Sequence, residues 1–130
     1  MPTILVIDDD VYLRMALQVS LEKEDFEVLT AIGGREGLDV AARENPDLIV
    51  LDLAMPDLDG TDVLGQLRDD IVTWDIPVVV FTARGDSESR AQSQRLGAMR
   101  FMQKPFSLNR LVSEIKRILG GRDSQPNTVG

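Results

Sequence analysis

The chain has 130 residues and a mass of 14.4 kDa, which is the size of one ordinary domain. Its 43% hydrophobic and 28% charged residues are typical of a globular protein, and its net charge of −8 disfavours nucleic acid or an anionic membrane as the main partner. The absence of Cys and His excludes disulfides, thiolate nucleophiles, Cys/His zinc sites, Ser-His triads and imidazole proton transfer. Any chemistry must therefore use carboxylates, hydroxyls, ammonium groups, backbone amides or a bound cofactor.

The sequence also bears on where the protein works. No stretch is long and apolar enough to span a membrane. The N-terminus has a short apolar run followed directly by three acids, which is unlike a signal peptide. We therefore expect a cytoplasmic protein.

Short apolar runs alternate along the chain with segments of helical periodicity. The runs at residues 4–7, 48–51 and 78–81 are continuously apolar, as in strands covered on both faces of a parallel sheet. Residues 28–31 form another short run of the buried type, and residues 99–102 form a weaker fifth run. The pattern predicts five short strands.

Helices are predicted between and after these runs. Four of them have an apolar stripe, formed by Leu13, Ala16, Leu17 and Leu21, by Leu38, Ala41 and Ala42, by Val63, Leu64 and Leu67, and by Leu108, Leu111, Val112, Ile115 and Leu119. Asp10 and Ser107 stand at N-cap positions, and the pair Gly120 and Gly121 predicts the end of the last helix. A further helix at about residues 87–96 has only Ala91 and Leu96 as apolar candidates, so we expect it to be weakly anchored and mobile.

This order of elements predicts an α/β fold. Five strand–helix pairs with right-handed crossovers favour a flavodoxin-like, doubly wound, five-stranded parallel sheet of order 2-1-3-4-5 with five helices. We expect this domain to occupy residues 1–119. Residues 120–130 lack periodicity and are expected to form a flexible tail or the start of a linker.

Polar residues follow four of the predicted strands, whose carboxyl ends meet at one edge of such a sheet. They are Asp8, Asp9 and Asp10 after the first strand, Asp52 after the third, Thr82 after the fourth, and Lys104 with Pro105 after the fifth. Neighbouring carboxylates repel one another by roughly 4 kcal/mol per pair at an intermediate dielectric, and Lys104 offsets only one charge. The cluster therefore either holds a proton or binds a hard divalent cation, namely Mg²⁺, Mn²⁺ or Ca²⁺.

A carboxylate beside such a metal, with a hydroxyl and an ammonium opposite, is an arrangement for phosphoryl transfer in which an Asp can be the nucleophile. Four motifs carry a resemblance that agrees with this interpretation. They are VIDD at residues 6–9, DLIVLDLAMP at 47–56 with Asp59 and Gly60, PVVVFTA at 77–83, and the stretch from Gly97 to Phe106 that contains Lys104 and Pro105. In this order the motifs resemble the receiver domain of two-component response regulators, a chemotaxis-regulator-like family, over about residues 3–119.

The resemblance implies a role for each matched residue. Asp52 resembles the phosphoacceptor. The implied ligands of Mg²⁺, with Mn²⁺ as the alternative, are Asp8, Asp9, Asp52 and the backbone carbonyl of Ala54. Thr82 and Lys104 resemble the hydroxyl and ammonium that contact the phosphoryl group. Phe101 falls at the family's aromatic switch position, and the Lys104–Pro105 peptide bond is expected to be cis.

The resemblance also implies partners. In that family the phosphoryl donor is a histidine kinase or a histidine phosphotransfer protein, and this chain, which has no His, cannot supply the donor itself. Phosphorylation would switch the face formed by the fourth helix, fifth strand and fifth helix, and a downstream effector protein or domain would respond. Direct nucleic acid binding and membrane insertion are not expected. The domain would be no enzyme apart from catalysing its own phosphorylation and dephosphorylation.

Two other functions fit the same fold. One is a binding module that works without phosphorylation, but the intact set of Asp52, Thr82 and Lys104 argues against it. The other is an Asp-nucleophile phosphatase or phosphotransferase, which needs a further acid two residues after the nucleophile, where this chain has Ala54.

Several residues also have plain structural interpretations. Asp10 is better explained as an N-cap than as a catalytic residue. Asp57 and Asp59 are expected to build the turn into the third helix. Phe101 is explained equally well as core, and Trp74 as an exposed loop residue.

Two departures from the family pattern affect the expected behaviour. Ala54 has no side chain to position an attacking water, and Arg84 can shield or pair with a phosphoryl group, so we expect slow self-dephosphorylation. Charges at Met99-Arg100, Arg110 and Glu114 differ from those of the winged-helix transcription-factor branch. We therefore expect a monomer or a weak phosphorylation-dependent dimer rather than that branch's salt-bridged dimer.

Overall fold

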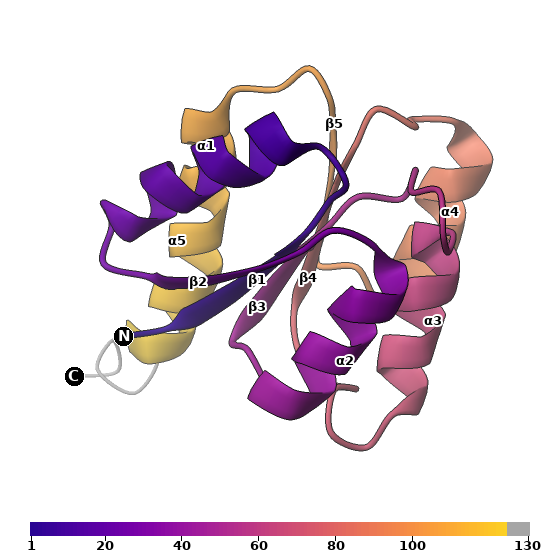
Figure 1. Cartoon of the computed structure of the whole chain (residues 1–130), viewed down its shortest axis with the longest axis horizontal. Helices are drawn as coiled ribbons and strands as arrows, with labels where there is room; N and C mark the ends of the chain where they lie inside the picture. Colours follow the sequence, from indigo (N-terminus) through magenta and orange to yellow (C-terminus); the bar gives the residue numbers. More distant parts are fainter. Residues whose placement is uncertain (125–130) are drawn as a thin grey trace.

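A computed structural model describes residues 1–124, in which strands and helices alternate from end to end (Figure 1). The strands are β1 (Thr3–Ile7), β2 (Glu27–Ala31), β3 (Leu48–Leu51), β4 (Val78–Thr82) and β5 (Arg100–Gln103). The helices are α1 (Val11–Glu22), α2 (Gly34–Glu44), α3 (Gly60–Asp69), α4 (Ser87–Arg95) and α5 (Leu108–Ser124). Each predicted strand lies within one residue of its observed position.

All five strands form one parallel sheet in the order β2-β1-β3-β4-β5, which confirms the predicted fold class. Central strand β1 pairs with β2 on one side and with β3 on the other, so that Ile7 lies opposite both Ala31 and Leu51. The connections leave β1 and β3 in opposite directions at this point. In open α/β sheets, ligands bind at such a switch point, outside the carboxyl ends of the strands.

Helices cover both faces of the sheet: α1 and α5 lie on one face, and α2, α3 and α4 on the other (Figure 1). Successive strand residues point to opposite faces, so Ile4 and Val6 pack with α1 and α5, while Leu5 and Ile7 pack with α2 and α3. Two apolar cores result, one on each side, and they hold the strand ends rigidly.

Helix α4 packs differently from the prediction. Its buried residues are Ser89 and Ser93, whereas Ala91 and Leu96 are only half-buried. Ser93 is fully buried, and its hydroxyl has no hydrogen-bond partner within the described part of the chain. A smaller difference occurs in α2, where Val40 faces the core and the predicted Ala42 is exposed.

Helix α5 extends beyond its predicted end. It continues through Gly120 and Gly121 to Ser124, so the predicted stop at the glycine pair is wrong. Glycine costs about 1 kcal/mol in a helix but does not prevent it, and the buried Ile118 and Leu119 anchor the preceding turn. The remainder of the predicted tail, residues 125–130, lies outside the described residues. No helix between residues 1 and 124 combines the length and apolarity needed to cross a membrane.

Candidate functional site

The carboxyl ends of β1 and β3 bring three carboxylates together, as the topology predicts. Asp8 and Asp9 follow β1, and Asp52 follows β3. One carboxylate oxygen from each of the three lies within 4.8 Å of the other two. Asp8 and Asp52 are buried, with 3% and 6% of their surface exposed, while Asp9 is exposed. The carboxyl edge of the sheet thus carries two buried carboxylates and one exposed carboxylate.

Backbone hydrogen bonds fix the two buried carboxylates. The amide of Asp8 donates to the carbonyl of Ala31 at 3.1 Å, and the amide of Asp52 donates to the carbonyl of Ile7 at 3.0 Å, so the sheet pairing extends one residue beyond each strand. The amide of Asp10 donates to Asp8 Oδ1 at 2.9 Å, and the amide of Ala54 to Asp52 Oδ1 at 3.1 Å. Each carboxylate is therefore oriented by the loop that follows it.

Gly60 allows the loop after Asp52 to return closely to the sheet. A Cβ atom at this position would lie 2.5 Å from the carbonyl oxygen of Asp52, which is closer than real Cβ contacts. The amide of Gly60 donates to the carbonyl of Leu53 at 2.9 Å. This hydrogen bond and close backbone contact fix the start of α3 against Leu53, the residue that follows Asp52.

Lys104, directly after β5, supplies the positive charge of the site. Its Nζ lies 2.9 Å from Asp8 Oδ2 and 3.4 Å from Asp52 Oδ2. The amide of Lys104 donates to the carbonyl of Thr82 at 2.7 Å, and its peptide bond to Pro105 is cis. One ammonium therefore bridges the two buried carboxylates.

The charges perturb one another. Burial raises the pKa of Asp8 above its usual value, although the Asp10 amide and Lys104 favour its charged form. For Lys104, burial alone would lower the pKa, but the hydrogen bond to Asp8 and the charges of Asp52 and Asp8 together raise it. The Lys104 ammonium is thus held in its charged form, beside the Asp8 carboxylate, whose charged form is disfavoured by burial.

The donor set fits a hard divalent cation. Three carboxylates converge and a single ammonium faces them, so negative charge is in excess. All available ligand atoms are oxygens, because the chain has no Cys or His. Mg²⁺ is bound by one or two carboxylates together with waters and phosphate oxygens, and Asp8, Asp9 and Asp52 meet that requirement.

Thr82 ends β4 at the same edge, and it is fully buried. Its hydroxyl accepts a hydrogen bond from the Arg84 amide at 3.1 Å and makes none to Asp52. Ala54 is exposed two residues after Asp52. The site therefore brings Asp8, Asp9, Asp52 and Lys104 into one cluster, with Thr82 and Ala54 at its border.

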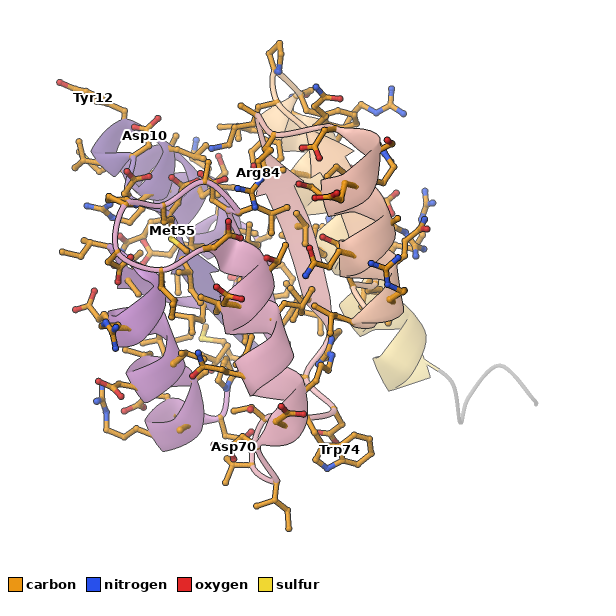
Figure 2. All side chains as sticks on the ribbon, turned by 90° about the vertical axis from the view of Figure 1, so that its right-hand side faces the viewer. Asp10, Tyr12, Met55, Asp70, Trp74 and Arg84 are labelled. Carbon is orange, nitrogen blue, oxygen red and sulfur yellow. The ribbon has the colours of Figure 1, made fainter. Side chains whose placement is uncertain are left out.

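An unpredicted ion pair lies beside the cluster. Arg84 Nη1 and Nη2 donate to the two carboxylate oxygens of Asp59 at 3.0 and 2.8 Å, in the geometry of a bidentate pair. The hydrogen bonds from Arg84 hold the pKa of Asp59 well below its usual range. Figure 2 shows Arg84 at the same end of the molecule as Asp10 and Met55, opposite the end marked by Trp74. Arg84 therefore has a protein partner at the carboxyl edge.

Two further aspartates also contribute to the local structure. Asp59 accepts from the amide of Thr61 and is the N-cap of α3, so it lies in the predicted turn into that helix. Asp57 was expected to form the same turn, but its carboxylate accepts from the amides of Gly34 and Arg35 at the start of α2. These otherwise unpaired N–H groups attract the carboxylate, so Asp57 links the loop after Asp52 to α2. Its hydrogen bonds from the Arg35 and Gly34 amides lower the pKa of Asp57.

The remaining predicted residues lie nearby. Asp10 is the N-cap of α1 and accepts from the amides of Tyr12 and Leu13, which confirms its structural interpretation. Phe101 on β5 is half-buried against the α2–α3 core, with the Arg90 guanidinium 4.5 Å from its ring centre. Trp74 is 57% exposed in the loop before β4.

Two arginines were missed by sequence reasoning. Arg14 Nη1 donates to the carbonyl of Asp8 at 2.7 Å and so supports the acidic loop. Arg68 donates from Nε to the carbonyl of Leu96, from Nη1 to those of Trp74 and Ile76, and from Nη2 to that of Gly97. In the sequence, Arg14 and Arg68 occupy helix positions outside the apolar stripes, as ordinary surface residues do. No sequence signal distinguishes them from such residues.

Comparison with known families agrees with the site. The family model described as "Response regulator receiver domain" matches residues 4–116. Among curated proteins, the transcriptional regulatory protein PrrA of Mycobacterium tuberculosis is 41% identical over 123 residues, a match that covers 95% of this chain and 52% of that protein. The dual master transcriptional regulator RpaA of Synechocystis is 36% identical over 129 residues, which cover 99% of this chain and 54% of RpaA. The chain thus spans about half the length of these curated relatives.

Solved structures share the architecture. A CheY-like response regulator receiver domain protein of Methanospirillum hungatei superposes with a TM-score of 0.90 and is 26% identical, with coverage of 96% of this chain and 98% of that one. The receiver domain of the Francisella response regulator 1452 has a TM-score of 0.84 and 30% identity, with coverage of 95% and 99%. Fold, motif order and acidic cluster agree in pointing to one family.

Proposed function

This chain belongs to the response regulator receiver domain family of two-component systems, and from that premise we propose that Asp52 is its phosphoacceptor. The observation that carries the proposal is the cluster of Asp8, Asp9 and Asp52 with Lys104 bonded to two of its members. Asp52 and Asp8 are both buried, and each contacts the ammonium and an amide of its own loop, but only Asp52 stands at the phosphoacceptor position of the family motif. It is therefore held in place for attack on phosphorus.

The reaction is a transfer of one phosphoryl group. An oxygen of Asp52 forms a bond to the phosphorus of a phosphohistidine on a partner protein, and the phosphorus–nitrogen bond breaks, which returns the imidazole to that partner. As in the receiver family, the donor would be a histidine kinase or a histidine phosphotransfer protein, and this chain, which has no His, cannot supply the phosphohistidine itself. Lys104 would provide a positive charge for the transferred oxygens, and Thr82, at the end of β4, would contact them.

Mg²⁺ would be held by Asp8, Asp9, Asp52 and the Ala54 carbonyl, with Mn²⁺ as the alternative. When bound, it neutralises phosphoryl oxygens and the crowded carboxylates. The negative charges of Asp8 and Asp9 would balance the positive charge of the ion. The Asp10 amide orients the carboxylate of Asp8, and the Ala54 amide orients that of Asp52. The fit of an all-oxygen donor set supports this assignment.

Phosphorylation at Asp52 would work as a switch rather than as enzymatic turnover. The added negative charge would attract Thr82 and Lys104. We propose that this attraction shifts the face built by α4, β5 and α5 between two states, and that the Phe101 ring changes its position with that face. A downstream effector protein or domain responds to that face. The domain itself contacts neither nucleic acid nor membrane, and it is a monomer or a weak phosphorylation-dependent dimer.

The receiver domain has an extent along the chain and a location in the cell. We propose that residues 1–119 form the body of the receiver domain, from which α5 continues to Ser124, and that the protein works in the cytoplasm. The match of the receiver-domain family model to residues 4–116 supports this view.

A direct test is incubation with Mg²⁺ and acetyl phosphate, followed by measurement of the intact mass. We expect the addition of one phosphoryl group to the natural protein and none to the Asp52→Asn variant. Removal of Mg²⁺ with a chelator should abolish uptake. Asp39→Asn, which changes another carboxylate, on α2, is the matched control and should behave like the natural protein. Phosphorylation that persists in Asp52→Asn would refute the assignment.

A second test addresses the lifetime of the phosphorylated state. Ala54 has no side chain to position water, and Arg84, two residues after Thr82, can shield the phosphoryl group, so we expect self-dephosphorylation to be slow. Decay of the phosphorylated mass in Mg²⁺ buffer after removal of acetyl phosphate measures this rate. A half-life of seconds would contradict the expectation.

A further inference from the structure

Positive charge is concentrated in one part of this acidic chain. Residues 90–119 contain seven of the 14 basic residues and only one of the 22 acidic residues, a local charge of +6 in a chain of net charge −8. This segment comprises most of α4, all of β5 and the part of α5 up to Leu119. We call the surface of these three elements the basic face.

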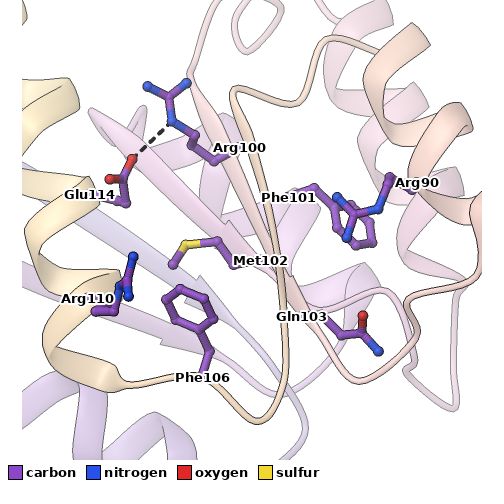
Figure 3. A pocket seen from close by; sticks show the side chains of 8 residues that line it. All are labelled: Arg90, Arg100, Phe101, Met102, Gln103, Phe106, Arg110 and Glu114. Atoms are coloured by element: carbon purple, nitrogen blue, oxygen red, sulfur yellow. Dashed lines mark hydrogen bonds and ion pairs between the residues drawn. The ribbon is translucent and has the colours of Figure 1, made fainter.

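A groove lies in the middle of the basic face, between α4 and α5 (Figure 3). Its cavity volume is about 340 Å³, which is within the range of pockets that bind ligands. Its lining consists of Arg90, Arg100, Phe101, Met102, Gln103, Phe106, Arg110 and Glu114. Because β5 is the edge strand of the sheet, the bottom of the groove is a strand with one open side.

Two arginines of the groove are paired with rings instead of with acids. The Arg90 guanidinium lies 4.5 Å from the ring centre of Phe101, and that of Arg110 lies 5.3 Å from the ring centre of Phe106. Neither makes an ion pair with any residue that the structure describes. Stacking holds each charge in place and leaves its N–H groups open to a ligand.

The single acid of the groove is already neutralised. Glu114 binds Arg100 Nε at 3.0 Å through one oxygen and Arg117 Nη1 at 3.3 Å through the other. The free charge of the groove is therefore positive. Two phenyl rings and Met102 give it an apolar surface as well.

We propose that this groove binds an acidic segment of a partner protein, with its carboxylates on Arg90 and Arg110 and one apolar side chain against Phe101 and Phe106. The inference rests on the proposed function, because it names the kind of partner that the α4–β5–α5 face would recognise. Arginine and aromatic side chains are the residues most enriched at the energetic centres of protein interfaces. Opposite charges on the two partners would speed encounter and align the segment.

The charge distribution disfavours a symmetric dimer through this face. A two-fold axis would place the basic face of one copy against the same face of the other. Juxtaposed like charges then oppose association. An acidic segment from a different protein faces no such repulsion.

Nucleic acid is disfavoured for a related reason. The rest of the chain, outside residues 90–119, carries seven basic and 21 acidic residues and repels a long polyanion. A short acidic peptide is confined to the groove and avoids that repulsion. The apolar floor also matches a side chain better than a phosphate backbone.

The groove is connected to the phosphoacceptor site through β5. Gln103 lines the groove and lies opposite Thr82 in the β4–β5 pairing, and Lys104 is the next residue. A change in the position of Thr82 or Lys104 therefore reaches the groove through adjacent backbone. Affinity for the segment should differ between the phosphorylated and unphosphorylated protein.

The test uses a short synthetic peptide of Asp and Glu with a central Phe, titrated into the isotope-labelled full chain and followed by amide chemical shifts. We expect saturable shifts confined to α4, β5 and the start of α5, and binding that weakens as salt is added. Arg90→Gln and Arg110→Gln should each weaken binding several-fold, and the double variant by about tenfold or more. Arg35→Gln, an exposed arginine on α2, is the matched control and should leave binding unchanged.

Three other probes decide among the alternatives. A peptide with Lys in place of its acids and a single-stranded DNA oligonucleotide should not bind. Sedimentation of the natural protein and of the Arg110→Gln variant should show no dimer that depends on Arg110. Any one of four results would overturn the inference. They are binding of the basic peptide as strong as that of the acidic one, binding of DNA in preference to the acidic peptide, a dimer that depends on Arg110, and no saturable binding of the acidic peptide. Acetyl phosphate uptake at Asp52 is measured on the same samples, so a protein that is phosphorylated but does not bind the peptide refutes only the groove.

Discussion

Helices α3 and α4 lie side by side on one face of the sheet, yet different interactions hold them (Figure 1). Helix α3 buries Val63, Leu64 and Leu67 completely or nearly so. Helix α4 presents Ser89 and Ser93 to the interior instead. Burial of large apolar side chains contributes roughly 1.5–3 kcal/mol each, and α4 has none that is fully buried.

Arginine contacts at both ends compensate for the polar inner surface of α4. Before α4, Arg84 binds Asp59 at the start of α3. After α4, Arg68 in the last turn of α3 donates to the carbonyls of Leu96 and Gly97. Such directional contacts can be broken one at a time, whereas a packed apolar surface yields only as a whole. We therefore expect α3 to be the fixed member of the pair and α4 to be the member able to move.

The largest expected effect is in the core of α3. Leu64→Ala should lower the free energy of unfolding by about 3 kcal/mol, because it leaves a cavity where a fully buried side chain packed. Leu96→Ala, at the half-buried end of α4, should cost only about 1 kcal/mol. Urea unfolding followed by circular dichroism measures both values. Equal losses would show that α4 is anchored as firmly as α3.

The next effect concerns the arginine that joins the two helices. Arg68→Met should lower the free energy of unfolding by about 2 kcal/mol, because four carbonyls lose a charged donor. Arg68→Lys should recover less than half of this loss, since an ammonium cannot reproduce the fork of a guanidinium. Arg43→Met is the control: Arg43 is exposed and pairs only with its neighbour Glu44, so little change is expected. If Arg43→Met cost as much as Arg68→Met, the joining role of Arg68 would be lost.

The sequence predicted the strands, their order and the meeting of Asp8, Asp52 and Lys104 because these follow from few rules. Continuous apolar runs identify buried strands, and parallel strands carry their following residues to one edge. The backbone alone therefore brings these residues together. Their identity as oxygen donors and a cation then indicated the kind of site.

Contacts between loops were not predictable in the same way. The pair of Arg84 and Asp59, the bonds of Asp57 to the start of α2, and the four carbonyls at Arg68 depend on loop paths and side-chain rotamers. No periodicity encodes them. The inner surface of α4 was missed for a similar reason, because buried serines follow no apolar pattern.

A smaller effect of opposite sign is expected inside α4. Ser93→Ala should raise the free energy of unfolding by about 1 kcal/mol, because it removes a buried hydroxyl without a partner and introduces a better helix former. Hydrogen exchange of α4 amides should slow more than that of α3 amides. Ser113→Ala on the exposed side of α5 is the control for helix propensity alone and should give about half the gain or less. A loss of stability in Ser93→Ala would show that the hydroxyl has a stabilising partner.

The smallest effect concerns the ion pair at the other end of α4. Asp59→Asn keeps an N-cap for α3 but removes the charge that Arg84 binds. The Asp59 side chain is 41% exposed and that of Arg84 32%, so water screens the pair, and we expect a loss of about 0.5 kcal/mol at neutral pH.

The pH dependence identifies this loss with the ion pair. The pKa of Asp59 is lowered in the folded protein by the hydrogen bonds from Arg84, so the unfolded chain binds a proton more readily. The stabilisation is therefore complete above the ordinary pKa of 3.8 and declines as the pH falls below it. Urea unfolding of both proteins between neutral pH and pH of about 3 should show a difference that shrinks on acidification. A difference that stays constant would assign the loss to the α3 cap instead, and the polar attachment of α4 would then depend on Arg68 alone.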